Sequence, residues 1–83
     1  MLPGDPRADP HVIDLIELAG LWLAADDRIA LERTLRQLLA ALDERFVEDA
    51  SFRERWLRLL EAVTDAQPPP EELRRQYRRA TLG

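Results

Sequence analysis

Two stretches of the sequence place large apolar residues at the spacing of an amphipathic helix, which limits the possible folds more than any other feature. In residues 28–47 these residues recur at steps of four, three and four, the pattern of one buried helix face. They are Leu31, Leu35, Leu38, Leu42 and Phe46, with Leu39 widening the stripe. Residues 52–66 repeat the pattern with Phe52, Trp56, Leu59, Leu60 and Val63. No strand-like alternation or hairpin dipeptide appears, so the chain is predicted to be all-α.

Residues that cap or break helices mark the predicted helix ends. Asp9 followed by Pro10 favours the start of a first helix over residues 10–25. Ser51 and Glu54 have the spacing of a capping box at the start of residues 52–66. One continuous helix over residues 28–66 is the alternative, but the apolar stripe loses its phase near Asp49 and Ser51, which favours a break.

Three consecutive prolines, Pro68 to Pro70, end the third predicted helix because proline lacks an N–H donor and its ring clashes with the preceding turn. Pro70 can then open a fourth helix over residues 70–80. We therefore predict a small three- to four-helix bundle with a Pro-Pro-Pro break before a short C-terminal helix. Its parts are a flexible N-terminal arm over residues 1–9, a helical core over residues 10–67, and a proline hinge with an Arg-rich helix over residues 68–83.

The first predicted helix is apolar around more than half of its circumference, and such helices are usually buried on several sides. A chain of 83 residues without Cys has few neighbouring segments to cover it and no disulfide to stabilise it. We therefore expect part of this surface to contact another chain, and we predict a homodimer. The predicted interface residues are Val12, Leu15, Ile16, Ala19, Trp22, Leu23, Leu31 and Leu35.

Few residues of this chain are suited to catalysis. A nucleophilic triad needs a base beside the nucleophile, yet the sequence has one His, His11, and one Ser, Ser51. We interpret His11 as solvent-facing, Ser51 as a helix cap, and Asp14 and Glu17 as a solvated stripe. With one His and no Cys, a structural zinc site is not expected. We expect no enzyme activity, no catalytic residue, no cofactor, no metal site and no small-molecule substrate.

Two short segments resemble known families. Residues 24–32, from Ala24-Ala25-Asp26-Asp27 to Glu32, resemble the acidic turn of TerB-like tellurite-resistance domains, although Asp27 replaces a glycine of that family. Residues Asp49-Ala50-Ser51-Phe52 resemble the modification site of acyl carrier proteins, in which a serine after Asp carries phosphopantetheine. Here Ala50 separates the two residues. An Asp-capped turn and a capping Ser explain the same residues without either family.

Charge is distributed unevenly along the chain. The net charge is −4 and every basic residue is Arg, but residues 71–83 hold four Arg and only two acids. The predicted basic strip comprises Arg74, Arg75, Tyr77, Arg78 and Arg79. These side chains can pair with the acidic N-terminal part of the chain, bind an acidic protein, or contact phosphates while Tyr77 stacks on a base.

No apolar run reaches the roughly 18 residues of a membrane span, and the N-terminus lacks the pattern of a signal peptide. We therefore expect no membrane partner and a cytoplasmic location. The predicted function is a non-catalytic protein–protein interaction module: a small helical accessory, adaptor or regulatory subunit that forms a homodimer or binds another protein. The alternative is a regulator that binds nucleic acid or an acidic partner through the basic strip, with nucleic acid less favoured because of the net negative charge. An acyl-carrier-like protein is a remote alternative.

Overall fold

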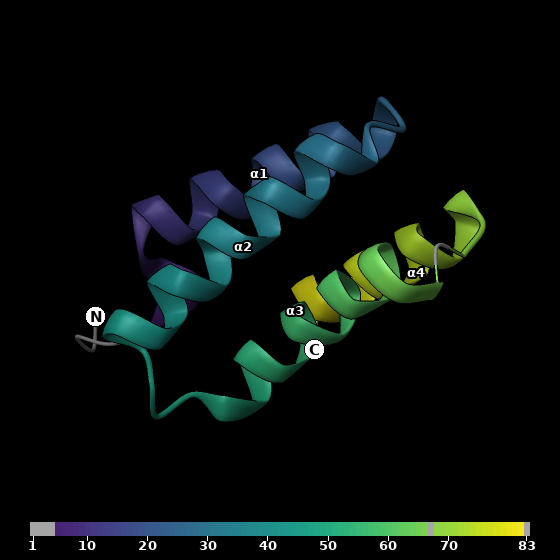
Figure 1. Ribbon diagram of the computed structural model, residues 1–83. Coiled ribbons are helices and arrows are strands. Elements are labelled where there is room, and N and C mark those ends of the chain that lie inside the picture. Colours follow the sequence, from purple (N-terminus) through teal and green to yellow (C-terminus); the bar gives the residue numbers. More distant parts are fainter. Residues whose placement is uncertain (1–4, 67, 83) are drawn as a thin grey trace.

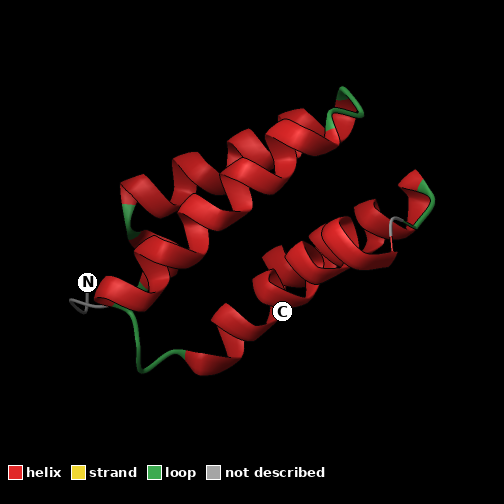
Figure 2. Ribbon diagram, in the orientation of Figure 1, coloured by secondary structure: helices red, strands yellow, loops and turns green. Residues whose placement is uncertain are grey.

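The computed structural model of the chain describes residues 5–66 and 68–82, and over these residues it is a bundle of four helices without strands (Figures 1 and 2). The helices are α1 (Pro10–Ala24), α2 (Arg28–Arg45), α3 (Ala50–Glu61) and α4 (Pro70–Leu82). A 3₁₀ turn at Pro6–Ala8 precedes α1, and a π-helical turn at Ala62–Ala66 extends α3. The prediction of a small all-α bundle is confirmed, and the break between α2 and α3 rules out one helix over residues 28–66.

The four helices form two antiparallel hairpins, α1 with α2 and α3 with α4, which lie against each other (Figure 1). α2 packs on α3 and α1 packs on α4, so the chain runs up and down around one core. The bundle measures 37 × 20 × 19 Å along its principal axes. The apolar stripes of all four helices can therefore face a common interior.

Two aspartates build the tight turn between α1 and α2. Asp26 has a φ of 55°, and its N–H donates to the Leu23 carbonyl oxygen while the Asp27 N–H donates to that of Trp22. These bonds form a Schellman motif, which usually places Gly at the left-handed position that Asp26 occupies here. Asp27 then caps α2, because its side chain accepts from the Ala30 N–H at 3.1 Å. At the start of α1, Asp9 caps the Val12 N–H in the same way, as the Asp9-Pro10 sequence predicts.

The predicted capping box at Ser51 is wrong. α3 begins at Ala50, so Ser51 is the second residue of the helix and is exposed to solvent. Asp49 occupies the cap position, but its side chain accepts no hydrogen bond from the helix. Its Oδ2 lies instead 3.4 Å from Nη1 of Arg7, so the carboxylate pairs with the segment before α1. The helix thus begins two residues earlier than the spacing of Ser51 and Glu54 implies.

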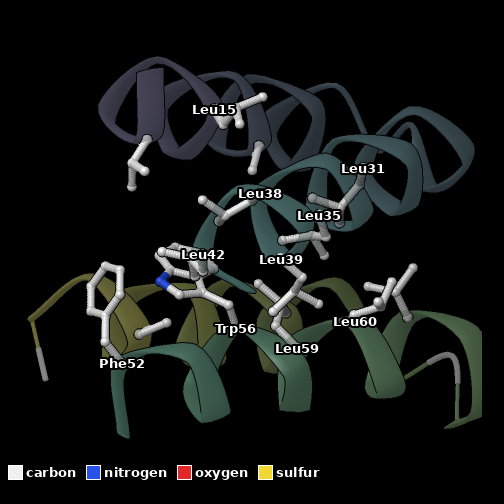
Figure 3. Packing of buried hydrophobic residues seen from close by; sticks show 14 of the residues in the cluster. Leu15, Leu31, Leu35, Leu38, Leu39, Leu42, Phe52, Trp56, Leu59 and Leu60 are labelled. Atoms are coloured by element: carbon white, nitrogen blue, oxygen red, sulfur yellow. The ribbon is translucent and has the colours of Figure 1, made fainter. Parts of the chain in front are cut away.

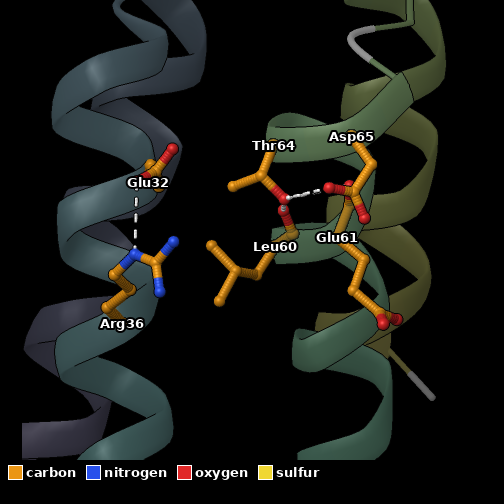
Figure 4. Close-up of polar contacts among 6 residues, drawn as sticks. All are labelled: Glu32, Arg36, Leu60, Glu61, Thr64 and Asp65. Atoms are coloured by element: carbon orange, nitrogen blue, oxygen red, sulfur yellow. Dashed lines mark hydrogen bonds and ion pairs between the residues drawn. The ribbon is translucent and has the colours of Figure 1, made fainter.

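The segment that joins α3 to α4 is held by local polar contacts (Figure 4). Thr64 donates its hydroxyl to the Leu60 carbonyl oxygen at 3.1 Å, inside the π-helical turn. Arg28 Nη2 donates to the Pro68 carbonyl oxygen at 2.7 Å, which ties this connection to the start of α2. α4 begins at Pro70, the first-turn position that suits a residue without an N–H donor.

Residues 5–9 differ from the loose arm that their Pro and charged residues predict. Asp5 caps the 3₁₀ turn by accepting from the Arg7 N–H, and Pro6 is buried. The Arg7 guanidinium lies 4.6 Å from the centroid of the Phe52 ring. This part of the arm is therefore packed against α3, while residues 1–4 of the predicted arm lie outside the described residues.

The core is built from the apolar stripes that the sequence predicts, centred on α2 and α3 (Figure 3). Trp56 is fully buried, and its ring meets Phe52 and Tyr77 edge to face at centroid distances of 6.2 and 5.7 Å. Such pairs add about 0.5–1.5 kcal/mol each beyond the burial of apolar area. Leu73 and Ala80 of α4 reach the same core, so α4 is a full member of the bundle.

Candidate functional site

The predicted dimer interface does not lie on the molecular surface. Ile16 and Trp22 are partly buried and pack against the core, and the other six residues belong to the core itself. Those six are Val12, Leu15, Ala19, Leu23, Leu31 and Leu35, all less than a tenth exposed.

 Ala19 and Val12 are fully inaccessible to solvent. In the single chain these residues therefore form the core, because α4 covers the side of α1 that the sequence left without a neighbour.

The exposed apolar side chains are others. Leu21 and Ile29 flank the α1–α2 turn with exposed fractions of 64 and 77%, and Ile13, Val47 and Leu82 are also exposed. The periodicity of the sequence did not separate these residues from the core positions of α1, because nearly every side of that helix carries an apolar residue. They lie on several elements and do not form one defined docking face.

The residues considered for catalysis lie on the surface of two helices, α1 and α3. His11, Asp14, Glu17 and Ser51 are all exposed. Within residues 5–66 and 68–82, no group of three or more His, Cys, Asp or Glu side chains is placed to hold a metal ion. None of the helices in the same described ranges is both long and apolar enough to cross a membrane.

The predicted basic strip divides into two parts with different environments. Arg74, Arg75, Arg78 and Arg79 are exposed along α4, as expected for a charged helix face. Tyr77 instead turns toward α1, where its hydroxyl donates to the Ile16 carbonyl oxygen at 2.8 Å. Its ring packs edge to face on Trp56 and is only partly exposed, unlike the four arginines.

A pocket of about 280 Å³ lies between α3 and α4, next to the exposed arginines. Its lining residues come from both helices and are Arg55, Arg58, Glu61, Gln76, Arg79 and Ala80. We call it the interhelical pocket. Arg55 and Arg58 were not among the predicted site residues, although their positions outside the apolar stripe of α3 were a usable signal. Only the pairing of α3 with α4 shows that they meet Arg79.

A second hollow, of about 380 Å³, lies on α4 between Glu71, Arg74, Arg75 and Arg78. Arg75 and Arg79 are one helical turn apart, so this hollow adjoins the interhelical pocket along α4. Arg75 forms an ion pair with Glu72 at 3.2 Å, and both side chains are largely in solvent. We refer to Arg55, Arg58, Arg74, Arg75, Arg78 and Arg79 together as the basic face.

The two hairpins differ in net charge. Residues 1–49 carry eleven acidic residues and five Arg, a net charge of −6, whereas residues 50–83 carry five acidic residues and seven Arg, a net charge of +2. The basic face therefore lies on the positive hairpin of a chain whose total charge is −4. An approaching anion meets opposite potentials on the two sides of the molecule.

Comparison with known proteins adds no relative: no family model, no curated protein and no solved structure matches this chain. The resemblances to TerB-like domains and to acyl carrier proteins thus have no support from these comparisons. The structure accounts for Asp26 and Asp27 by their roles in the α1–α2 turn.

Proposed function

We propose that this chain is a non-catalytic interaction module that binds an acidic partner protein through the basic face, acting as an accessory or regulatory subunit. The observation that carries the proposal is the gathering of six arginines around two adjoining hollows on one hairpin of an acidic chain. Arg is the residue best suited to such a surface, because its guanidinium binds carboxylates through two parallel hydrogen bonds.

Two observations favour a protein partner over nucleic acid. Tyr77 is engaged with Ile16 and Trp56, so the basic face lacks the aromatic platform that single-stranded nucleic acid uses. The α1–α2 hairpin, with its net charge of −6 in residues 1–49, also repels a long polyanion. A compact acidic segment can contact the basic face without approaching that hairpin.

The test is binding of a fluorescently labelled Glu-rich peptide, followed by anisotropy at low and at high salt. The wild-type chain is expected to bind at low salt and to lose affinity as salt increases, because exposed charge pairs are screened. The triple variant Arg74→Gln, Arg75→Gln, Arg78→Gln is expected to bind about tenfold more weakly. The matched control is Arg33→Gln with Arg36→Gln, which removes exposed charges from α2 on the acidic hairpin.

Three results would overturn this proposal. One is the absence of binding at low salt, and another is an equal loss of affinity in the α2 control. The third is tighter binding of a single-stranded oligonucleotide of the same charge, which would replace the acidic protein by nucleic acid. Light scattering on the free chain completes the experiment. If light scattering shows self-association that disappears both in the triple variant and at high salt, the acidic partner is a second copy of this chain.

A further inference from the structure

The interhelical pocket contains a guanidinium group whose hydrogen-bond donors lack acceptors. Nε and Nη2 of Arg55 are buried, and neither has a hydrogen-bond partner among the residues that the structure describes. The group lies 5.7 Å from the centroid of the Phe52 ring, an aromatic face that offers no hydrogen-bond acceptor of ordinary strength. A buried charged donor without an acceptor is costly, typically by more than about 1–3 kcal/mol.

The other two arginines of the pocket are weakly engaged. Arg79 forms no ion pair with any residue in the described part of the chain. Arg58 lies 3.5 Å from Glu54, but its side chain is 74% exposed, so this pair constrains it little. Both guanidinium groups are therefore free to turn toward an anion in the pocket.

The charge and size of the pocket suit a phosphate group. Three Arg and one Glu give its lining a formal charge of +2, and a phosphate monoester carries about −1.5 to −2 at neutral pH. Its oxygens can accept paired hydrogen bonds from several guanidinium groups at once, which a single carboxylate cannot do to the same extent. A volume of about 280 Å³ leaves room for the phosphate group between α3 and α4.

We propose that the interhelical pocket binds a phosphate group through Arg55, Arg58 and Arg79, with a modest turn of the Arg55 guanidinium presenting its unpaired edge to the phosphate oxygens. The group is either free inorganic phosphate or a phosphorylated side chain of the acidic partner, and in the second case the inference depends on the proposed function. Glu61 repels an anion in the pocket. Binding therefore requires a group that several arginines contact at the same time.

The test is titration of the ¹⁵N-labelled chain with inorganic phosphate at constant ionic strength, following the side-chain Nε–H signal of Arg55 by NMR. We expect a saturable shift of this signal, and a chloride titration is expected to leave it unchanged. The Arg55 variants lack this signal, so the Nε–H signal of Arg58, which lines the same pocket, reports binding in them. Arg55→Met is expected to weaken phosphate binding about tenfold. Arg55→Lys keeps the charge but not the paired donors, so its affinity is expected to lie between the two. Arg33→Gln, on α2, is the control of equal charge change and is expected to bind as the wild type does.

Arg79→Gln provides a second variant on an exposed side chain, so the test survives if Arg55→Met does not fold. It is expected to weaken phosphate binding while leaving the thermal midpoint of the free chain unchanged. The proposal is overturned if phosphate produces no saturable shift, or if Arg79→Gln and a folded Arg55→Met both bind phosphate like the wild type.

The source of the phosphate group is decided with a Glu-rich peptide that contains one phosphoserine and its unphosphorylated counterpart. Tighter binding of the phosphopeptide, lost in Arg55→Met, assigns the pocket to a phosphorylated partner. Phosphate binding without this preference assigns the pocket to the free ion.

The triple variant of Arg74, Arg75 and Arg78 separates the two proposals. If it retains phosphate binding but loses the unphosphorylated peptide, the pocket and the remaining basic face act independently. If the wild type binds the peptide but does not bind phosphate, the pocket proposal is rejected while the proposed function stands.

Discussion

Gly20 allows α4 to approach α1 closely. A Cβ atom at this position would lie 2.7 Å from Oη and 3.1 Å from Cζ of Tyr77, both too short for an ordinary contact. The tyrosine cannot move away freely, because it is hydrogen-bonded to Ile16 and packed on Trp56. The glycine is therefore explained by its contact with Tyr77, although glycine weakens a helix interior by about 1 kcal/mol relative to alanine.

A Gly20→Ala substitution is accordingly expected to destabilise the chain despite the higher helix propensity of alanine. In a Tyr77→Leu background, where the hydroxyl and the ring are absent, the same change is expected to stabilise it by up to about 1 kcal/mol. Urea unfolding of the two single variants and the double variant measures this reversal of sign. Equal effects of Gly20→Ala in both backgrounds would show that the contact with Tyr77 is unimportant.

The Tyr77 hydroxyl also makes stability depend on pH. Its burial, with a smaller contribution from the charge of Glu17, raises the pKa of Tyr77 above the ordinary value of 10.0. The unfolded chain then loses this proton at a lower pH than the folded chain, so stability is retained below about pH 10 and falls as the pH rises above it.

Tyr77→Phe is expected to lower the free energy of unfolding at neutral pH by about 0.5–1.5 kcal/mol, the usual contribution of one hydrogen bond. The difference from the wild type should shrink above pH 10, because the phenylalanine variant has no proton to lose at this position. Urea unfolding at pH 7 and above pH 10 tests both statements. A gap that stays constant with pH would contradict the role given to the hydroxyl proton.

At the scale of the helix, α2 and α3 begin differently although each follows an aspartate. Asp27 accepts a hydrogen bond from the Ala30 N–H, whereas Asp49 pairs with Arg7 and Ser51 lies in the first turn of α3. Asp27→Ala is therefore expected to cost about 1 kcal/mol of stability. Ser51→Ala is expected to change it by less than about 0.5 kcal/mol. Thermal unfolding of both variants measures the difference, and an equal loss for Ser51→Ala would restore the capping box.

The positions of the helices were predictable from the sequence because each carries a local signal. Asp9-Pro10 and Pro70 mark helix starts, and the Leu31-to-Phe46 stripe identifies the buried face of α2. The order of packing has no such signal. The apolar stripe of α4 is short, and its burial through Leu73 and Ala80 depends on which face of α1 it meets. For the same reason, neither the coverage of α1 nor the meeting of Arg55 with Arg79 could be predicted.

For the molecule as a whole, the predicted interface residues stabilise the fold of a single chain. Leu35 is fully buried between the helices, so Leu35→Ala is expected to reduce stability by about 2–5 kcal/mol. The loss should be the same at low and high protein concentration, since Leu35 packs within the core of its own chain. Urea unfolding across a dilution series provides the measurement. A loss that changes with concentration would return Leu35 to an interface between chains.

The pairing of helices has a consequence for the rate at which the chain folds. α1 with α2, α2 with α3 and α3 with α4 are neighbours in sequence, whereas the bond from Tyr77 to Ile16 closes a separation of 61 residues. Folding dominated by short-range contacts is fast, and a contact that needs a long loop to close tends to form after the rate-limiting step. Removing the Tyr77 hydroxyl would then accelerate unfolding while leaving the folding rate nearly unchanged. The contact between α1 and α4 would thus determine the rate at which the folded chain unfolds.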